Sequence, residues 1–162
     1  MSKTRLIPYD IKKCEGVMIL KFSSKLSDGV HILAYVDICK DGDLSSAAIA
    51  SSIESNPSLV RRMMSRLKKA GLLQSAPGKV APKLSKKASE ITLLDVYRAI
   101  EDNQNLLHVD EKTNPKCIVG GNIQDTLREV YQKVQNDAEE SMSQVSLQDI
   151  IDGILLNNEK KK

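Results

Sequence analysis

The sequence predicts a mainly α-helical fold with a small β-wing: a winged helix-turn-helix domain followed by a long C-terminal dimerisation helix. Three observations predict this fold. Two short helical segments flank a turn at residues 54–57, two strand-like segments flank Pro77-Gly78, and apolar residues recur every three or four positions from 123 to 145. A chain of 162 residues can hold one such domain and an appended helix.

The first two helices are predicted over residues 24–39 and 44–52. In the first helix, apolar residues recur at three- and four-residue spacing, and the Asp-Gly-Asp sequence at 41–43 ends it. The second helix is short and rich in alanine, which permits close packing against neighbouring helices. The turn at 54–57 then separates it from a third helix.

The third helix is predicted to begin at Pro57 and to end before Gly71. Asn56 is a suitable N-cap, and proline suits the first helical position because its missing N–H would be unpaired there. Val60, Met63, Met64 and Leu67 form the apolar face that the core buries. The opposite side is expected to face solvent, with Ser58, Arg61, Arg62, Ser65, Arg66 and Lys69. The second and third predicted helices together form a helix-turn-helix, and the later helix of such a pair fits the major groove of DNA.

A wing and a fourth helix follow. Residues 72–74 and 80–84 predict two strands around Pro77-Gly78. The fourth helix is predicted over 92–102, because Thr92 can cap it and Asp95 occupies the capping-box position. Residues 104–121 are expected to form a loop.

The longest helix is predicted over residues 122–144. Its apolar residues form a narrow stripe between charged residues, which is typical of a helix that packs against a partner helix. The predicted dimer interface comprises Ile123, Leu127, Val130, Val134 and Ala138. The alternative is that this helix packs lengthwise on its own domain. Ser146 is expected to cap a short final helix that ends at Leu155.

The charge of the chain divides between its two halves. The net charge is +3 overall, but residues 1–90 carry 16 basic and 8 acidic residues, or +8, and residues 91–162 carry 8 and 13, or −5. No acidic residue lies between Glu54 and Glu90. A stretch of one sign attracts anions, and the phosphate backbone of DNA is the commonest such partner. The alternative is a solvated helix face.

Several classes of protein are disfavoured. Three cysteines without a CxxC spacing argue against a disulfide framework and a zinc-thiolate site, and no nucleophile motif or phosphate-binding glycine loop indicates an enzyme. No stretch is long and apolar enough for a membrane span, so we expect no membrane partner. The basic N-terminus is interrupted by Asp10 and Glu15 and is not followed by an apolar run with a cleavage site, so we expect a cytoplasmic protein. Aromatic residues make up only 3% of the chain, which favours double-stranded DNA over single strands.

Several segments together resemble one family. They are residues 20–25, residues 45–73 with their RLKKAGLL ending, EITLLDVYRAIE at 90–101, and residues 122–124 and 146–151. These segments resemble the Rrf-type winged-helix regulators, the IscR/CymR/NsrR family. The resemblance implies a bacterial, homodimeric, sequence-specific transcription regulator on a palindromic promoter site. It leaves both a repressor and an activator open, and of these we expect a repressor. The alternative is a non-catalytic protein-interaction or dimerisation module that does not bind DNA.

The resemblance also divides the chain into parts. Residues 1–17 precede the usual family start and form an N-terminal extension, and residues 18–103 form the winged helix-turn-helix domain. Residues 104–121 form a sensor-type loop. Residues 122–158 form the dimerisation helix and terminal helix, and residues 159–162 form a basic tail.

The predicted DNA contacts lie in the winged helix-turn-helix domain. Arginine can pair with guanine through two hydrogen bonds, so the best base-reading candidates are Ser58, Arg61 and Arg62. Phosphate contacts are predicted for Arg66, Lys68, Lys69, Lys79 and Lys83. Ser45 and Ser65 complete the predicted interface.

Cys117 is the candidate sensor residue of the 104–121 loop. Cluster-binding relatives hold three cysteines there, whereas this loop has one, so we expect no iron–sulfur cluster and no other cofactor or metal. A thiol switch at Cys117 is one hypothesis, and small-molecule sensing by the loop is another. The alternative is an inert thiol, because Asp110 and Glu111 would raise its pKa, although nearby lysines act in the opposite direction.

Overall fold

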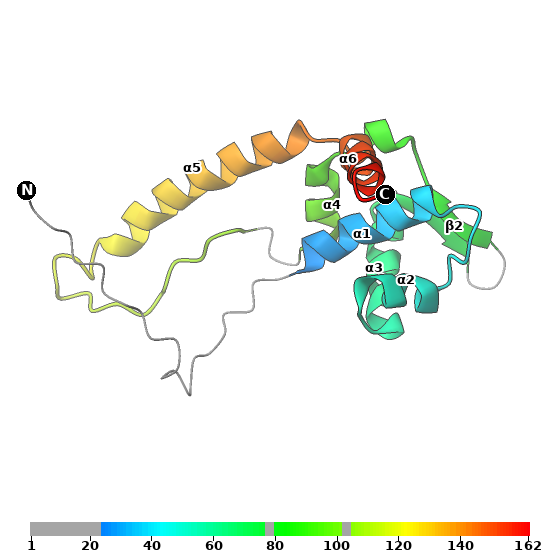
Figure 1. Cartoon of the computed structure of the whole chain (residues 1–162). Helices are drawn as coiled ribbons and strands as arrows, with labels where there is room; N and C mark the ends of the chain where they lie inside the picture. The colour runs from blue at the N-terminus through cyan, green and yellow to red at the C-terminus, as the bar shows by residue number, and fades with distance from the viewer. Residues whose placement is uncertain (1–23, 77–79, 102–104) are drawn as a thin grey trace, which may run out of the picture.

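The computed structural model describes residues 24–76, 80–101 and 105–162. Figure 1 shows a helical domain beside a small hairpin, with one long helix projecting from it. The elements are α1 (Lys25–Ile38), α2 (Ser46–Ile53), α3 (Pro57–Lys69), β1 (Leu73–Ala76), β2 (Val80–Leu84), the 3-10 turn η2 (Ala88–Glu90), α4 (Leu93–Ile100), α5 (Ile123–Ser143) and α6 (Leu147–Glu159). The predicted mainly α fold class with a small wing is confirmed. Within the described residues, no helix is long and apolar enough to cross a membrane.

Local side-chain chemistry sets the ends of the short helices. The Asn56 carboxamide oxygen accepts the Ser58 N–H at 2.7 Å, and Pro57 follows it at the first position of α3. Glu54 caps the C-terminal end of α2 with a left-handed φ of 55°, and Gly71 adopts a φ of +72° just after α3. These positive φ angles turn the chain sharply after each helix.

The wing is a two-stranded antiparallel sheet. Leu73 pairs with Leu84 and Gln74 with Lys83, and the register shifts before Ala76 pairs with Val80. The predicted strands are therefore present. The tip of the wing, including the predicted phosphate contact Lys79, lies outside the described residues.

One apolar core unites α1, α2, α3, α4 and the strand residues. Its most buried side chains are at most 1% exposed and include Leu33, Ile49, Val60, Leu67, Leu73 and Ile100. Fully burying such a side chain contributes about 1.5–3 kcal/mol. α1 and α4 approach closely at Gly29, where an added Cβ would lie 2.9 Å from Ile100 Cγ1. This core fixes α3 against the rest of the domain.

The last helix also belongs to this core. Leu147 and Ile151 of α6 are 1% and 3% exposed and join the buried cluster. Two backbone hydrogen bonds join the start of α6 to the start of α4. Leu93 N–H donates to Val145 O and Leu147 N–H donates to Ile91 O, both at 2.8 Å, and each of the two helices begins with a capping box. From the sequence, α6 is expected to form one unit with the predicted dimerisation helix. In the structure, the first half of α6 instead packs into the winged-helix domain. α6 also runs to Glu159, beyond the predicted end at Leu155.

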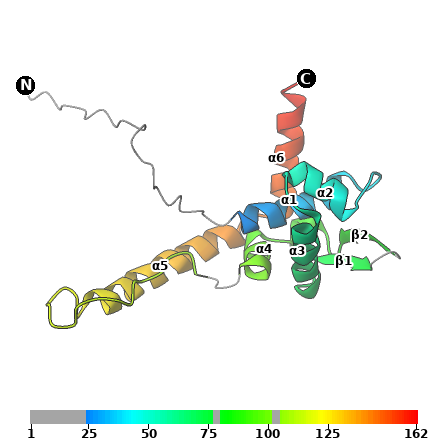
Figure 2. The ribbon, with the colours of Figure 1, turned by 90° about the horizontal axis from the view of Figure 1, so that it is seen from below.

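α5 leaves the domain instead of lying lengthwise on it. Both views show its C-terminal end beside α4 and its other end far from the domain, with the 105–121 segment running back along it (Figures 1 and 2). Gln135 is the one buried side chain of α5. Val130 and Val134 are 51% and 43% exposed. The apolar stripe of α5 is therefore largely unburied within one chain.

Candidate nucleic-acid interface

α3 presents two chemically different faces. Its apolar side is buried, with Val60, Met63 and Leu67 between 0% and 4% exposed. The opposite side is exposed as the sequence predicts, with Ser58, Arg61, Arg62, Ser65 and Lys69. Because the apolar side is committed to the core, only the polar and basic side can meet another molecule.

Arg61 is held in place by two serines. Its Nη1 donates to Ser46 Oγ and its Nη2 donates to Ser58 Oγ, both at 3.0 Å. The guanidinium therefore bridges the first turns of α2 and α3. Bonds of this kind reduce the side-chain entropy that is lost when a partner binds. Ser46 is absent from the predicted interface, and its sequence separation of 15 residues gives no signal for this contact.

Arg66 departs from the predicted exposed face. Its Nη1 donates to Ile100 O at 2.8 Å in a half-buried position, where it pairs with the C-terminal end of α4. Such a position is favourable because helix C-termini carry partial negative charge. The expectation that Arg66 faces solvent with its neighbours is therefore wrong, and the bond instead ties α3 to α4. Its predicted phosphate contact remains a prediction.

The other predicted contacts lie around α3. Lys68 Nζ donates to Ser75 O of β1, so this lysine links α3 to the wing while its side chain remains exposed. Lys83 is exposed on β2. Ser45 is exposed at the start of α2, and its hydroxyl accepts the Ala48 N–H at 3.1 Å, so the hydroxyl oxygen already serves as the N-cap.

The charge of this region is one-sided. α2, α3 and the turn between them contain five basic residues and one acidic residue, Glu54. The three basic residues of the last turn of α3, namely Arg66, Lys68 and Lys69, also complement the negative end of its helix dipole. The region is therefore suited to a polyanion.

A family model described as "Iron-dependent Transcriptional regulator", Rrf2, matches residues 22–153. The chain belongs to the Rrf2 family of transcriptional regulators. The predicted resemblance is thus confirmed, and the match covers the winged-helix domain, the 105–121 segment, α5 and the first half of α6. Membership implies DNA as a partner, and the names of the family and of its relatives are those of transcriptional regulators.

Relatives of known sequence or structure agree with this assignment. YwnA of Bacillus subtilis, named as an HTH-type transcriptional regulator, is 41% identical over 129 residues, which cover 80% of this chain and 96% of YwnA. A crystal structure described as that of a DNA-binding protein is 40% identical, covers 79% of this chain and 99% of its own, and has a TM-score of 0.62. The structure of T. potens IscR, at 23% identity, covers 86% and 91% with a TM-score of 0.60, and shows the same fold.

The expectation that the chain holds no iron–sulfur cluster stays a prediction, and the positions of two cysteines bear on it. Cys117 is exposed in the 105–121 segment, whereas Cys39 lies at the end of α1 in the winged-helix domain. Among the described residues, no group of three His, Cys, Asp or Glu side chains could hold a metal ion. Such clusters generally need four protein ligands. Cys14 lies outside the described residues.

The environment of Cys117 differs from the expected one. The backbone N–H groups of Gly120 and then Val119 hydrogen-bond the sulfur and lower the pKa of its thiol. The prediction that Asp110 and Glu111 outweigh the nearby lysines and raise this pKa is wrong, because the pKa is lowered and backbone hydrogen bonds of the turn are the cause. A lower pKa increases the thiolate fraction at neutral pH.

Proposed function

We propose that this Rrf2-family chain is a homodimeric repressor that binds a palindromic promoter site through α3. The exposed basic face of α3, with Arg61 fixed between Ser46 and Ser58, supports this proposal most directly. A recognition helix placed in the major groove brings its first turns to the base edges. Ser58, Arg61 and Arg62 would read bases, and the flanking lysines would neutralise phosphates.

A second copy of this chain is the proposed partner for α5. Val130 and Val134 expose apolar surface along the stripe of Ile123, Leu127 and Ala138. Packing this stripe against the same stripe of another copy would bury it and create a two-fold axis. Two α3 helices related by that axis would match a palindromic site, and a dimer on a promoter would exclude other proteins from the DNA.

The 105–121 segment is the proposed sensing part. It runs along α5, so a change in this segment would alter the surface next to the proposed dimer helix. Cys117, with its exposed thiol and lowered pKa, supports thiol sensing there.

Promoter binding tests the proposal. The purified protein is titrated with its own upstream promoter fragment and with a scrambled duplex, at two salt concentrations and with or without peroxide. We expect specific binding that weakens steeply with salt, because each phosphate contact releases counterions. Failure to bind either duplex would favour an interaction module instead. Unchanged promoter affinity after peroxide treatment would contradict thiol sensing.

A further inference from the structure

A cavity of about 360 Å³ lies between residues 105–111 and α5. Two hydrogen bonds hold its wall to the helix: Leu106 N–H donates to Gln135 Oε1 at 2.9 Å, and Gln124 Nε2 donates to Asp110 O at 3.1 Å. The wall is therefore attached to α5 on both sides of the cavity. This volume lies at the lower end of the range for small-molecule sites.

The lining combines charges of both signs with apolar groups. Arg128 and His108 can donate hydrogen bonds to an anion, and Glu111 can accept them from a cation. Tyr131 is half-buried and contributes a phenol. Leu107 lines the cavity as well and offers apolar surface. Such a set matches a molecule that carries a carboxylate, an ammonium group and a small uncharged side chain.

The cavity does not compete with the proposed dimer stripe. Successive residues of an α-helix are about 100° apart, so Arg128, Tyr131 and Gln135 share one face of α5. By the same geometry, Val130 and Val134 lie on a face about 120° away. A second α5 helix packed on the valines would leave the cavity accessible.

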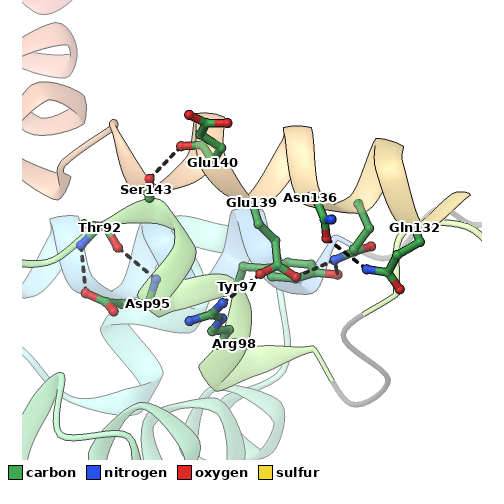
Figure 3. Close-up of polar contacts among 10 residues, drawn as sticks. Thr92, Asp95, Tyr97, Arg98, Gln132, Asn136, Glu139, Glu140 and Ser143 are labelled. Atoms are coloured by element: carbon green, nitrogen blue, oxygen red, sulfur yellow. Dashed lines mark hydrogen bonds and ion pairs between the residues drawn. The ribbon is translucent and has the colours of Figure 1, made fainter.

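A polar network connects the cavity with the DNA-binding domain. Gln135, which lines the cavity and is 8% exposed, donates to Glu139 Oε1 at 2.8 Å and lies 3.5 Å from the Tyr97 hydroxyl of α4. Arg98 of α4 donates to the other oxygen of Glu139 at 2.7 Å. Figure 3 shows Tyr97, Arg98 and Glu139 turned toward one another between the two helices. α4 in turn accepts the Arg66 bond from α3.

We propose that this cavity binds a free α-amino acid with an uncharged side chain, and that its occupancy changes promoter affinity through Gln135 and α4. Arg128 and His108 would bind the carboxylate, and Glu111 would bind the ammonium group. The inference rests on the proposed function, because it names the effector class of the regulator. A ligand that contacts Gln135 can bias α4 only through a difference in affinity between two arrangements of this network.

Calorimetric titration of the full-length protein with each common L-amino acid tests the site. For an amino acid that binds, its amide and its 2-hydroxy acid analogue are titrated as well. Arg128→Gln is expected to weaken binding by roughly 10- to 100-fold, the effect of losing a hydrogen bond to a charged group. Asp125→Asn removes the ion pair of Arg128 but keeps the arginine, and Lys133→Gln removes a charge outside the cavity. Both controls should bind normally.

The second readout is promoter affinity with and without the amino acid that binds. We expect a change of roughly 5- to 150-fold, which is usual for coupled sites, and a smaller change in Glu139→Gln. Absence of amino acid binding in a protein that still binds its promoter specifically would overturn this inference alone. Equal binding by wild type and Arg128→Gln would do the same, and an amino acid that binds without changing promoter affinity would overturn the coupling. Loss of specific promoter binding in every condition would overturn the proposed function instead.

Discussion

α3 and α5 are both amphipathic helices, yet the chain uses their apolar sides differently. The apolar side of α3 is buried against the rest of its own domain, and Leu67 is 0% exposed. Along the α5 stripe, Val130 and Val134 remain 51% and 43% exposed. The same spacing of apolar residues therefore indicates a core helix in one place and an unpaired surface in the other. The width of the stripe distinguishes them, since a narrow seam suits a single partner helix.

The sharpest test of this comparison replaces one apolar residue on each helix. Leu67→Ala is expected to lower the free energy of unfolding by about 2–5 kcal/mol at every protein concentration, because it leaves a cavity in the core. Val134→Ala should reduce stability only at concentrations where dimers form. Urea unfolding at several concentrations measures both effects. Concentration-independent losses of equal size would contradict the distinction.

Charges on the apolar stripe of α5 should prevent its proposed packing against a second copy of the chain. The double change Val130→Asp and Val134→Asp is expected to weaken the proposed dimer by at least about 2 kcal/mol, or roughly 30-fold, because unpaired charges would be buried. Asn136→Asp is the matched control, since this exposed residue lies on another face of α5. Sedimentation equilibrium gives the mass of each variant. A wild type that stays monomeric would contradict the proposed interface.

A change on the exposed side of α3 should have a similar or smaller effect, here on promoter affinity. Arg62→Ala should lower specific promoter affinity by about 1–3 kcal/mol if Arg62 reads a base, and should reduce the salt slope by about one if it contacts phosphate. Lys160→Ala removes a charge at the far end of α6, away from α3 in Figure 2, and should leave binding unchanged. Titrations on promoter and scrambled duplexes at two salt concentrations separate the two roles.

The capping box of α4 predicts a smaller effect on stability. Burial raises the pKa of Asp95, but hydrogen bonds from Thr92 and the charge of Lys86 outweigh it and lower the pKa overall. A lowered native pKa stabilises the fold at neutral pH, and this contribution is lost in acid below about pH 4. Thr92→Ala should lower the free energy of unfolding by about 1 kcal/mol at neutral pH. Urea unfolding across the acidic range measures the loss, and an unchanged stability would contradict the capping role.

The smallest effect is a difference in reactivity between two thiols. Cys117 is exposed and has a lowered thiol pKa, whereas Cys39 is half-buried. Iodoacetamide should therefore modify Cys117 faster at neutral pH, since the thiolate is the reactive form. Mass spectrometry of partly modified protein gives the two rates. Faster modification of Cys39 would contradict the assigned environment of Cys117.

The sequence predicted those features that depend on neighbouring residues. The Asn56-Pro57 start of α3, the box of Thr92 and Asp95, and the cap at Ser146 are all readable because a cap and its helix lie within a few residues. The exposed side of α3 followed from periodicity alone. The starts of these helices and the exposed side of α3 were therefore predictable, whereas the end of α6 was not.

Contacts between distant segments could not be predicted in this way. Ser46 orients Arg61, and Ile100 draws Arg66 away from solvent, but hydrophobic periodicity carries no signal for either bond. Leu147 and Ile151 complete the core of the winged-helix domain, although they follow α5 in the chain. In the sequence, nothing distinguishes Gln135 from the other polar residues of α5. Its burial follows from contacts with Tyr97 of α4 and with Leu106. Tertiary packing decides all of these positions.

Titration of the promoter duplex with three proteins tests the central claim most directly: the wild type, Arg62→Ala, and the double Val130→Asp, Val134→Asp variant. We expect two wild-type chains to bind one palindromic duplex and Arg62→Ala to bind it more weakly. The double variant should lose affinity because the two α3 helices are no longer joined. Wild-type affinity in both variants, with one chain bound per duplex, would contradict DNA recognition by α3 in a dimer joined through α5.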